Sequence, residues 1–250
     1  MEISLNENER LDDLELNGLR IIQNKEYFCF GIDAVLLADF ARDMKQNGVV
    51  MDLGTGTGII PLILSAKTNC NKIVGVEIQE GVFNIAKRNV KLNNLENLID
   101  LKNCNIKDLS EIYDMGSIDT IVTNPPYKEL GRGIVNETEN KLISRHEVKA
   151  NLEDFIKVSG YLLKDKGLMY MVHKPERLVD ILCLMRRYKL EPKVLRYVFS
   201  DVNSEPTLIL IKAVKNGKSF LKTEKNLYIY DGIGNYSDEI LKIYGKERGK

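Results

Sequence analysis

The amino-acid sequence predicts an α/β protein built around one mostly parallel sheet of seven strands. From Gly48 onward, short strand-like apolar runs alternate with helical stretches, and such alternation is typical of a parallel sheet with helices on both faces. Two further runs, Lys193 to Ser200 and Thr207 to Val214, are separated by a link too short for a helix. We therefore expect them to pair antiparallel as a hairpin at the sheet edge.

A short β-hairpin is expected ahead of this sheet. Leu11 to Leu16 and Leu19 to Ile22 flank Asn17-Gly18, which is a strong signal for a two-residue turn. Asp33 then stands in the position of an N-cap, before a helix with apolar periodicity that runs to Phe40.

The strands and helices of the sheet region follow in order from the apolar pattern. Strands are expected at Val49 to Leu53, Lys72 to Glu77, Ile99 to Lys102, Ile118 to Thr123 and Gly167 to Val172. Helices are expected at Ile59 to Lys67, Glu80 to Asn93, Ile106 to Tyr113, Glu147 to Leu163 and Pro175 to Tyr188. Ligands of such sheets bind at the carboxyl edge, so residues that directly follow a strand are candidates for a site.

Composition and length exclude several classes of protein. With 36 basic and 36 acidic residues, the chain has no net charge that would attract a polyanion as a whole. An acidic N-terminus and the lack of an apolar run of membrane-spanning length indicate a cytoplasmic protein. Four scattered cysteines without CxxC spacing and two histidines argue against disulfides and against a metal site. We expect an N-terminal hairpin extension at 1–32, a main domain at 33–222 and a C-terminal tail at 223–250 that packs on it.

A glycine-rich turn, Asp52 to Gly58, follows the first expected strand of the sheet. Its glycines let the backbone turn tightly and approach a ligand at the start of the next helix. The dinucleotide fingerprint is GxGxxG, whereas here the third glycine comes one position early. The carboxylate of Asp52 suits a cofactor with an ammonium group better than a pyrophosphate, unless it only caps the turn. Glu77 ends the next strand, where it could accept two ribose hydroxyls or simply be solvated.

The segment Asn124-Pro125-Pro126-Tyr127 directly follows the strand that ends at Thr123. A residue before proline is held extended, so the chain leaves the strand in one stiff direction. The side-chain oxygen of Asn124 and the carbonyl oxygen of Pro125 can accept both hydrogens of one planar NH2 group, which frees the nitrogen lone pair for attack. Tyr127 can stack on the plane of that target. The structural alternative is an ordinary diproline turn.

With these motifs in this order, the chain resembles the class I S-adenosylmethionine-dependent N-methyltransferases, whose Rossmann-like sheet of seven strands ends in a reversed hairpin. Phe28 to Ala38, Tyr228 to Tyr230 and Asn235 to Glu239 make it similar to the bacterial tRNA1(Val) adenine-N6-methyltransferase family. The resemblance extends from about residue 11 to about residue 244. It implies an enzyme that moves a methyl group from S-adenosyl-L-methionine to an exocyclic amine, namely adenine N6 in tRNA.

The resemblance also implies the residues of the site. The cofactor-binding set is Gly31, Asp33, Asp52, Gly54, Thr55, Gly56, Glu77, Ile78, Asn105, Ile106 and Asn124, and the catalytic set is Asn124, Pro125, Pro126 and Tyr127. In this superfamily an acidic residue usually faces the adenine of the cofactor where this chain has Asn105, although an amide can still bond to an adenine edge. Asp108 is the alternative, unless it caps the following helix. Gly31 and Asp33 fit a helix cap and its turn equally well.

The acceptor is less closely defined than the reaction. A guanine-N2 RNA methyltransferase and a protein-glutamine N5-methyltransferase remain alternatives, as do a non-catalytic binding module and a nicotinamide-dependent oxidoreductase. The segment before Asp33 is too short for the helical domain of the glutamine enzymes, and the large recognition domain of DNA adenine methyltransferases is not expected. Basic residues after the diproline motif favour RNA as the partner: Lys128, Arg132, Lys141, Arg145, His146 and Lys149. Two further basic clusters, within 186–196 and 242–250, fit ordinary solvated charge better.

Overall fold

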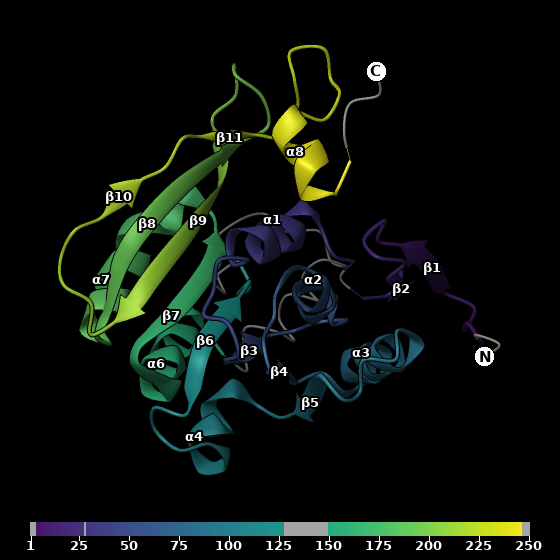
Figure 1. Ribbon diagram of the computed structural model, residues 1–250, viewed down its shortest axis with the longest axis horizontal. Coiled ribbons are helices and arrows are strands. Elements are labelled where there is room, and N and C mark those ends of the chain that lie inside the picture. Colours follow the sequence, from purple (N-terminus) through teal and green to yellow (C-terminus); the bar gives the residue numbers. More distant parts are fainter. Residues whose placement is uncertain (1–3, 28, 128–149, 247–250) are drawn as a thin grey trace.

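A mixed sheet forms the centre of the molecule in the computed structural model, which describes residues 4–27, 29–127 and 150–246 (Figure 1). Within these ranges the sheet has nine strands in the order β10-β8-β9-β7-β6-β3-β4-β5, and β11 also pairs with β8. The strands are β3 (Val49–Leu53), β4 (Lys72–Glu77), β5 (Ile99–Asn103), β6 (Ile118–Thr123), β7 (Leu163–His173), β8 (Leu190–Phe199), β9 (Pro206–Lys215), β10 (Lys222–Thr223) and β11 (Leu227–Tyr228). The seven expected strands are all present. The two-residue strands β10 and β11 add to them along β8.

The direction of the strands confirms a mostly parallel sheet that ends in an antiparallel hairpin. Strands β3 to β7 run parallel to one another, whereas β9 is antiparallel to both β7 and β8. Leu53 of β3 pairs with Val76 of β4 on one side and with Thr123 of β6 on the other. The residues that follow these three strands therefore emerge side by side at one edge of the sheet.

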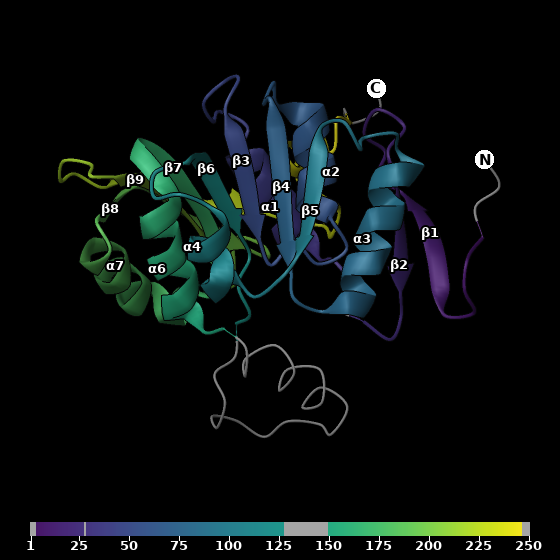
Figure 2. The same ribbon diagram turned by 90° about the horizontal axis from the view of Figure 1, so that it is seen from below.

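Helices cover both faces of the sheet (Figure 2). They are α1 (Ile32–Phe40), α2 (Ile59–Lys67), α3 (Glu80–Leu92), α4 (Leu109–Ile112), α6 (Leu152–Leu162), α7 (Leu178–Arg187) and α8 (Asp238–Ile243), with 3-10 turns η1 (Ile106–Asp108) and η2 (Pro175–Arg177). Apolar side chains of α1, α2 and α8 pack in one hydrophobic layer, and those of α4, α6 and α7 pack in the other. Neighbouring residues of a strand, such as Val50 and Met51, belong to different layers because side chains alternate between faces.

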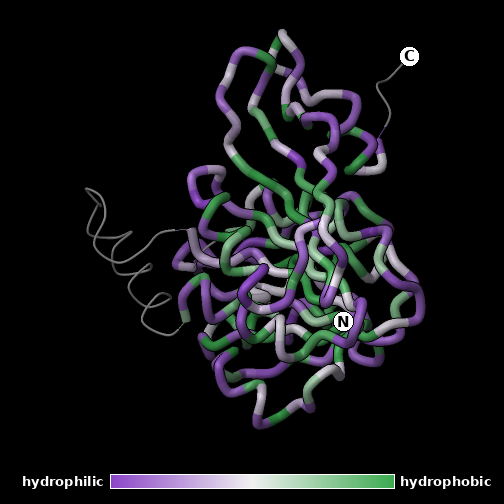
Figure 3. Tube along the Cα trace, turned by 90° about the vertical axis from the view of Figure 1, so that its left-hand side faces the viewer, coloured by the Kyte–Doolittle hydropathy of each residue, from purple (hydrophilic) through white to green (hydrophobic). Residues whose placement is uncertain are grey.

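The distribution of hydropathy follows this layering. Hydrophobic segments lie in the interior of the trace, and hydrophilic segments lie mainly along its periphery (Figure 3). The strands β3, β4 and β6 are almost entirely buried, as expected for parallel strands that are covered on both faces. Packing in the core therefore fixes where the last residue of each of these strands lies, at the edge of the sheet that carries the site.

The N-terminal hairpin packs against α3 at the far end of the sheet (Figure 2). Its strands are β1 (Glu9–Asp13) and β2 (Arg20–Asn24). Asn17 and Gly18 do form the turn, with φ of 51° and 72°. Strand β1 ends at Asp13 and not at Leu16 as expected, and β2 begins at Arg20 and not at Leu19, so both strands stop short of the turn. Glu15 also has a positive φ, which interrupts the regular ladder before the turn is reached.

Buried Asn89 of α3 joins this hairpin to the glycine-rich turn. Its side chain accepts a hydrogen bond from Ile22 N and donates to Ile22 O and to Thr57 O, at 2.6, 3.0 and 2.9 Å. A single side chain thereby satisfies backbone groups of two separate segments, which positions the hairpin beside the site.

Several expected boundaries and caps were wrong. The expected helix Ile106 to Tyr113 is a 3-10 turn followed by one short α-helix. Helix α6 begins at Leu152 with a capping box made by Asn151 and Asp154, and the expected residues Glu147 to Lys149 lie outside the described ranges. Gly31, not Asp33, is the N-cap residue of α1, so Asp33 lies in the first helical turn.

None of the helices within residues 4–27, 29–127 and 150–246 is long and apolar enough to span a membrane. In the same ranges, histidine, cysteine and acidic side chains form no group that could hold a metal ion.

Candidate active site

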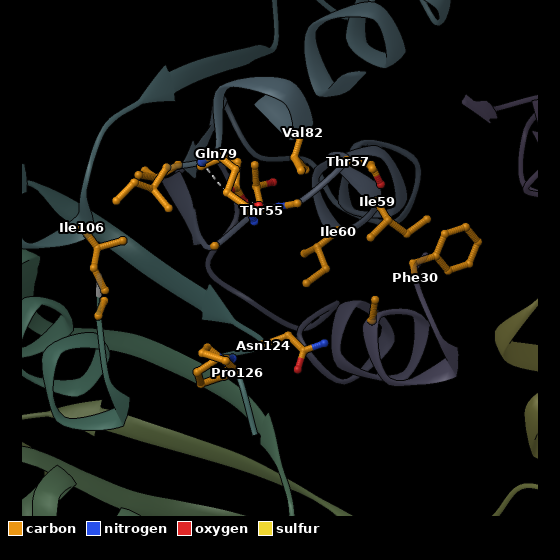
Figure 4. A pocket seen from close by; sticks show the side chains of 18 of the residues that line it. Phe30, Thr55, Thr57, Ile59, Ile60, Gln79, Val82, Ile106, Asn124 and Pro126 are labelled. Carbon is orange, nitrogen blue, oxygen red and sulfur yellow. Dashed lines mark hydrogen bonds between the residues drawn. The ribbon is translucent and has the colours of Figure 1, made fainter. Parts of the chain in front are cut away.

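A cavity of about 630 Å³ opens at the carboxyl ends of β3, β4, β5 and β6. It is lined by two groups of residues from opposite sides: the glycine-rich turn with the segments after β4 and β5, and the diproline motif with the start of α1. Figure 4 shows Thr55 and Ile60 across the open space from Asn124 and Pro126, with Ile106 and Phe30 at either end. The strand register explains part of this grouping, because the segments that follow β3, β4, β5 and β6 emerge at the same edge of the sheet.

The glycine-rich turn is held in place by β4. Gly54 N and Thr55 N both donate to Val76 O, at 3.0 and 2.9 Å. Gly54 and Gly56 have φ of 75° and 57°, a conformation that residues with a Cβ rarely adopt. The turn can therefore present bare backbone to a ligand in the cavity.

Glu77 braces the same turn from the end of β4. One carboxylate oxygen accepts from Gly56 N at 3.0 Å and the other from Gln79 N at 2.8 Å (Figure 4). The side chain is buried but still lines the cavity. Each oxygen keeps acceptor capacity beyond its one backbone bond, so a pair of hydroxyl donors can still be held.

Asp52 lies behind the turn and does not line the cavity. It is fully buried, and neither carboxylate oxygen has a hydrogen-bond partner among the described residues. Burial raises the pKa of Asp52 to about 7, the nearby Thr55 hydroxyl offsets part of that rise, and the charge of Glu77 adds to it. The site thus contains a carboxylate whose charge is poorly compensated.

Asn105 and Ile106 form the side of the cavity after β5. Asn105 is the N-cap of η1, and its side-chain oxygen accepts from Lys107 N at 3.1 Å. Both residues line the cavity, whereas Asp108 does not. Asp108 is the N-cap residue of α4 but its side chain makes no capping hydrogen bond, so the expected capping role was wrong for this residue.

The diproline motif meets the start of α1 through one carboxylate. Asn124 Nδ2 and the Tyr127 hydroxyl both donate to Asp33 Oδ2, at 3.0 and 2.8 Å. Burial, followed by the adjacent charge of Asp33, raises the pKa of Tyr127 well above its ordinary value. The phenol is therefore neutral at physiological pH and acts as a hydrogen-bond donor.

The ring of Tyr127 is also held from the end of β7. The His173 ring packs edge-on against it with centroids 5.2 Å apart, and Lys174 Nζ lies 5.4 Å from the Tyr127 centroid. His173 is 1% exposed, and burial, followed by the nearby charge of Arg177, lowers its pKa to about 4. A neutral imidazole beside Tyr127 was not expected from the sequence.

Most residues expected in the site line this one cavity, and two do not. Those that line it are Asp33, Gly54, Thr55, Gly56, Glu77, Ile78, Asn105, Ile106, Asn124, Pro125, Pro126 and Tyr127. Gly31 and Asp52 lie outside the lining. Sequence reasoning missed further lining residues: Tyr27, Cys29, Phe30, Ala34, Thr57, Ile59, Ile60, Val76, Gln79, Val82, Ala150 and Phe155. Thr57 and Gln79 could have been found because they adjoin the motifs, whereas Phe155 comes from a distant helix without a motif.

Of the basic clusters in the sequence, only the one that follows the diproline motif was expected to contact RNA. Lys128, Arg132, Lys141, Arg145, His146 and Lys149 lie outside the described ranges. In the cluster near β8, Arg186 pairs with Glu191 and Arg187 pairs with Glu153. These ion pairs support the interpretation of that cluster as ordinary surface charge.

The residues of the cavity fit a cofactor that carries a positive charge and ribose hydroxyls. The uncompensated carboxylate of Asp52 lies behind the turn, and Glu77 offers spare acceptor capacity inside the cavity. Gly56 leaves open space, because a Cβ at that position would meet no atom of the described residues within 4 Å, apart from the residues next to it in the chain. A pyrophosphate would suit these two carboxylates poorly.

Solved structures show the same fold. A predicted O-methyltransferase of Agrobacterium tumefaciens superposes with a TM-score of 0.69 and 15% identity, over 85% of this chain and 95% of that one. The geranyl diphosphate C-methyltransferase of Streptomyces coelicolor, solved with S-adenosyl-L-homocysteine, gives a TM-score of 0.53 and 14% identity over 72% and 80% of the chains.

Sequence comparisons give the family. The model of the methyltransferase small domain matches residues 31–182. The tRNA1(Val) (adenine(37)-N6)-methyltransferases of Aeromonas salmonicida and Porphyromonas gingivalis are 25% and 26% identical, each over 85% of this chain and over 87% and 86% of their own lengths. That of Haemophilus influenzae is 24% identical over 89% of this chain and 92% of its own. The chain belongs to the methyltransferase small domain family and is an S-adenosylmethionine-dependent methyltransferase.

Proposed function

We propose that this protein methylates the exocyclic N6 amine of an adenine in tRNA. The observation that carries the proposal is the placement of Asn124-Pro125-Pro126-Tyr127 across one cavity from the glycine-rich turn and Glu77. One wall suits a charged cofactor with ribose hydroxyls, and the opposite wall offers acceptors for a planar NH2 group. The relatives that are named as tRNA adenine-N6-methyltransferases support the choice of acceptor.

On the cofactor side, we assign Glu77 to the ribose hydroxyls, the backbone of Gly54 to Gly56 to the polar end, and Ile78 and Ile106 to the adenine faces. S-adenosylmethionine, when bound, supplies a methyl group activated by a positively charged sulfur. Asp52 favours that positive charge from behind the turn, because its carboxylate has no hydrogen-bond partner among the described residues. Gly31 does not line the cavity and is not assigned to the cofactor directly.

On the acceptor side, the Asn124 side-chain oxygen and the Pro125 carbonyl oxygen accept the two hydrogens of the target amine. These bonds withdraw the nitrogen lone pair from the ring and turn it toward the methyl group. Tyr127 limits the tilt of the target base. As the new N–C bond forms, the amine nitrogen becomes positively charged and its protons become acidic. One proton can therefore leave to water after the transfer, and no side-chain base is required.

A direct test compares wild type with Asn124→Ala, using Asn203→Ala as the matched control because Asn203 is exposed and remote from the cavity. Each protein is incubated with labelled S-adenosylmethionine and total tRNA, and the products are digested to nucleosides. We expect N6-methyladenosine with wild type and the control. With Asn124→Ala we expect turnover to fall by about 100-fold or more, with affinity for S-adenosylhomocysteine changed by less than about 3-fold.

Other outcomes of this assay would contradict the proposal. Labelled N2-methylguanosine, or label in protein extract and none in RNA, would assign a different acceptor. Normal turnover by Asn124→Ala would overturn the role of the amide. Tight binding of NAD in calorimetry without binding of S-adenosylhomocysteine would overturn the cofactor assignment.

A further inference from the structure

Asp33 connects the first turn of α1 to the diproline motif, although the residues are more than ninety positions apart in the sequence. Its side chain is 8% exposed. Oδ1 accepts from Ala34 N at 2.9 Å, while Oδ2 accepts from Asn124 Nδ2 and from the Tyr127 hydroxyl. Among the described residues, no lysine or arginine forms an ion pair with this carboxylate. Its charge is held by these three donors and by the amino end of the helix.

The chemistry of these bonds fixes the orientation of the Asn124 amide. A carboxylate only accepts hydrogen bonds, so the NH2 group of Asn124 must face Asp33. Rotating the amide by half a turn would place its oxygen against the carboxylate oxygen, which is repulsive and leaves both without a donor. The Asn124 oxygen is therefore kept away from Asp33 and available to accept a hydrogen from another molecule.

The same carboxylate oxygen fixes the ring of Tyr127. The hydroxyl is tied to Asp33, the ring edge meets His173, and Lys174 Nζ lies over the ring. The plane of the ring is thus defined from several sides before a substrate arrives. A preset plane restricts the tilt of a base that packs against it.

The absence of a side chain at Gly31 leaves space for the Asp33 carboxylate in this position. A Cβ at position 31 would lie 2.9 Å from Asp33 Oδ1 and 3.7 Å from its Cγ, and apart from the two adjoining residues it would meet no other atom of the described residues within 4 Å. The backbone at Gly31 has φ −105° and ψ −177°, which any residue can adopt. The glycine is therefore explained by the Asp33 side chain and not by backbone strain.

We infer that Asp33 is a positioning residue of the methyl-acceptor site, which sets the amide of Asn124 and the ring of Tyr127 for an incoming amine. This inference rests on the proposed function, in which the Asn124 oxygen accepts from that amine. Asp33 should therefore affect the turnover rate kcat and not the affinity for the cofactor, although its side chain borders the same cavity.

The test uses Asp33→Asn, which keeps the shape of the side chain but removes its charge and leaves one oxygen for three donors, so that its NH2 group must face a donor at one of the two oxygen positions. Asp39→Asn is the matched control, because Asp39 lies on the same helix and pairs with Lys67 away from the cavity. We expect Asp33→Asn to lower kcat for tRNA methylation roughly 10- to 100-fold. We expect KM for S-adenosylmethionine and Kd for S-adenosylhomocysteine to stay within about 3-fold of wild type. Asp39→Asn should leave all three values unchanged.

Gly31→Ala is a second and independent variant, since its methyl group would press on the Asp33 carboxylate alone. It should lower kcat by about 3- to 10-fold with the same unchanged affinity for S-adenosylhomocysteine. A double variant of Asp33→Asn with Asn124→Ala should be slowed by less than the product of the two single effects, because part of the effect of Asp33 passes through Asn124 and only the part through Tyr127 remains.

The outcomes separate this inference from the proposed function. If Asn124→Ala loses turnover but Asp33→Asn and Gly31→Ala keep wild-type kcat, the positioning role is wrong and the proposed function stands. If both variants weaken S-adenosylhomocysteine binding as much as they lower kcat, Asp33 belongs to the cofactor site and the inference is overturned. If Asn124→Ala itself keeps full turnover, the proposed acceptor site fails first.

Discussion

Replacing Asp52 by Asn should change how the stability of the protein depends on pH. Asp52 is fully buried without a hydrogen-bond partner among the described residues, and its pKa is raised from 3.8 to about 7, chiefly by burial. The folded protein therefore binds a proton at this site more tightly than the unfolded chain does. The stability that this proton contributes is complete below about pH 4 and is lost as pH rises through about 7.

The size of the effect follows from the interval between the two pKa values. Each tenfold change in proton affinity corresponds to about 1.4 kcal/mol, so the full loss is about 4 kcal/mol above pH 7. Asparagine carries no titratable proton and lacks this dependence. The buried amide has its own cost, but that cost is constant with pH. The stability of Asp52→Asn minus that of wild type should therefore rise by roughly 3 kcal/mol between pH 5 and pH 8.5.

The assay is urea unfolding of both proteins across this pH range, followed by circular dichroism. The stability curve of wild type must be subtracted from that of Asp52→Asn, because His173 is present in both proteins and titrates in the opposite sense to Asp52. Its pKa is lowered to about 4 from 6.5, so its contribution to stability is lost as pH falls from 6.5 to 4. In wild type the two groups nearly cancel between pH 4 and 6.5. A flat wild-type profile in that window is therefore the expected result.

A difference curve that stays constant within about 0.5 kcal/mol from pH 5 to 8.5 would refute the reasoning. It would show that folding does not change the proton affinity of Asp52, and hence that the carboxylate is compensated in the folded protein. Asp52 would then have no uncompensated charge with which to favour a positively charged cofactor.

Two further predictions concern groups around the site. His173→Gln should make unfolding free energy fall with rising pH between 4 and 6.5, by about 3 kcal/mol relative to wild type, in the same urea experiment. Asn89→Ala should destabilise the protein by about 3 kcal/mol, because it removes three buried hydrogen bonds to Ile22 and Thr57. Thermal unfolding with and without S-adenosylhomocysteine measures this loss, and a change below about 1 kcal/mol would contradict it.

The parts of the fold that sequence reasoning predicted well are those with a strong local pattern. The bounds of β3, α2, β4 and β6 match the expected residues, because each is a largely apolar run with a clear end: Gly54 after β3, a charged last residue in α2 and β4, and Asn124-Pro125 after β6. The two-residue strands β10 and β11 are too short to show any periodicity. They form only because β8 offers an unpaired edge.

The candidate site divides in the same way. The glycine-rich turn and the diproline motif could be recognised, because each places special residues directly after a strand. The contact between Asp33 and Tyr127 could not be recognised, since it depends on how α1 packs across the sheet. The same holds for His173, whose low pKa arises chiefly from burial in the folded protein, and for its packing against Tyr127.

The three acidic side chains near the cavity differ in how many donors already hold them, and this difference separates their roles. Asp33 accepts from three groups, Glu77 accepts from two backbone N–H groups, and Asp52 accepts from none that is described. A carboxylate that is already bonded gains little from a new positive charge, whereas an uncompensated buried one gains most. The preference for a positively charged cofactor therefore arises from Asp52 behind the glycine-rich turn, whereas the geometry of the acceptor site is set by Asp33 at the start of α1. Because the two are built from different segments, Asp52→Asn should act on cofactor affinity and Asp33→Asn on turnover.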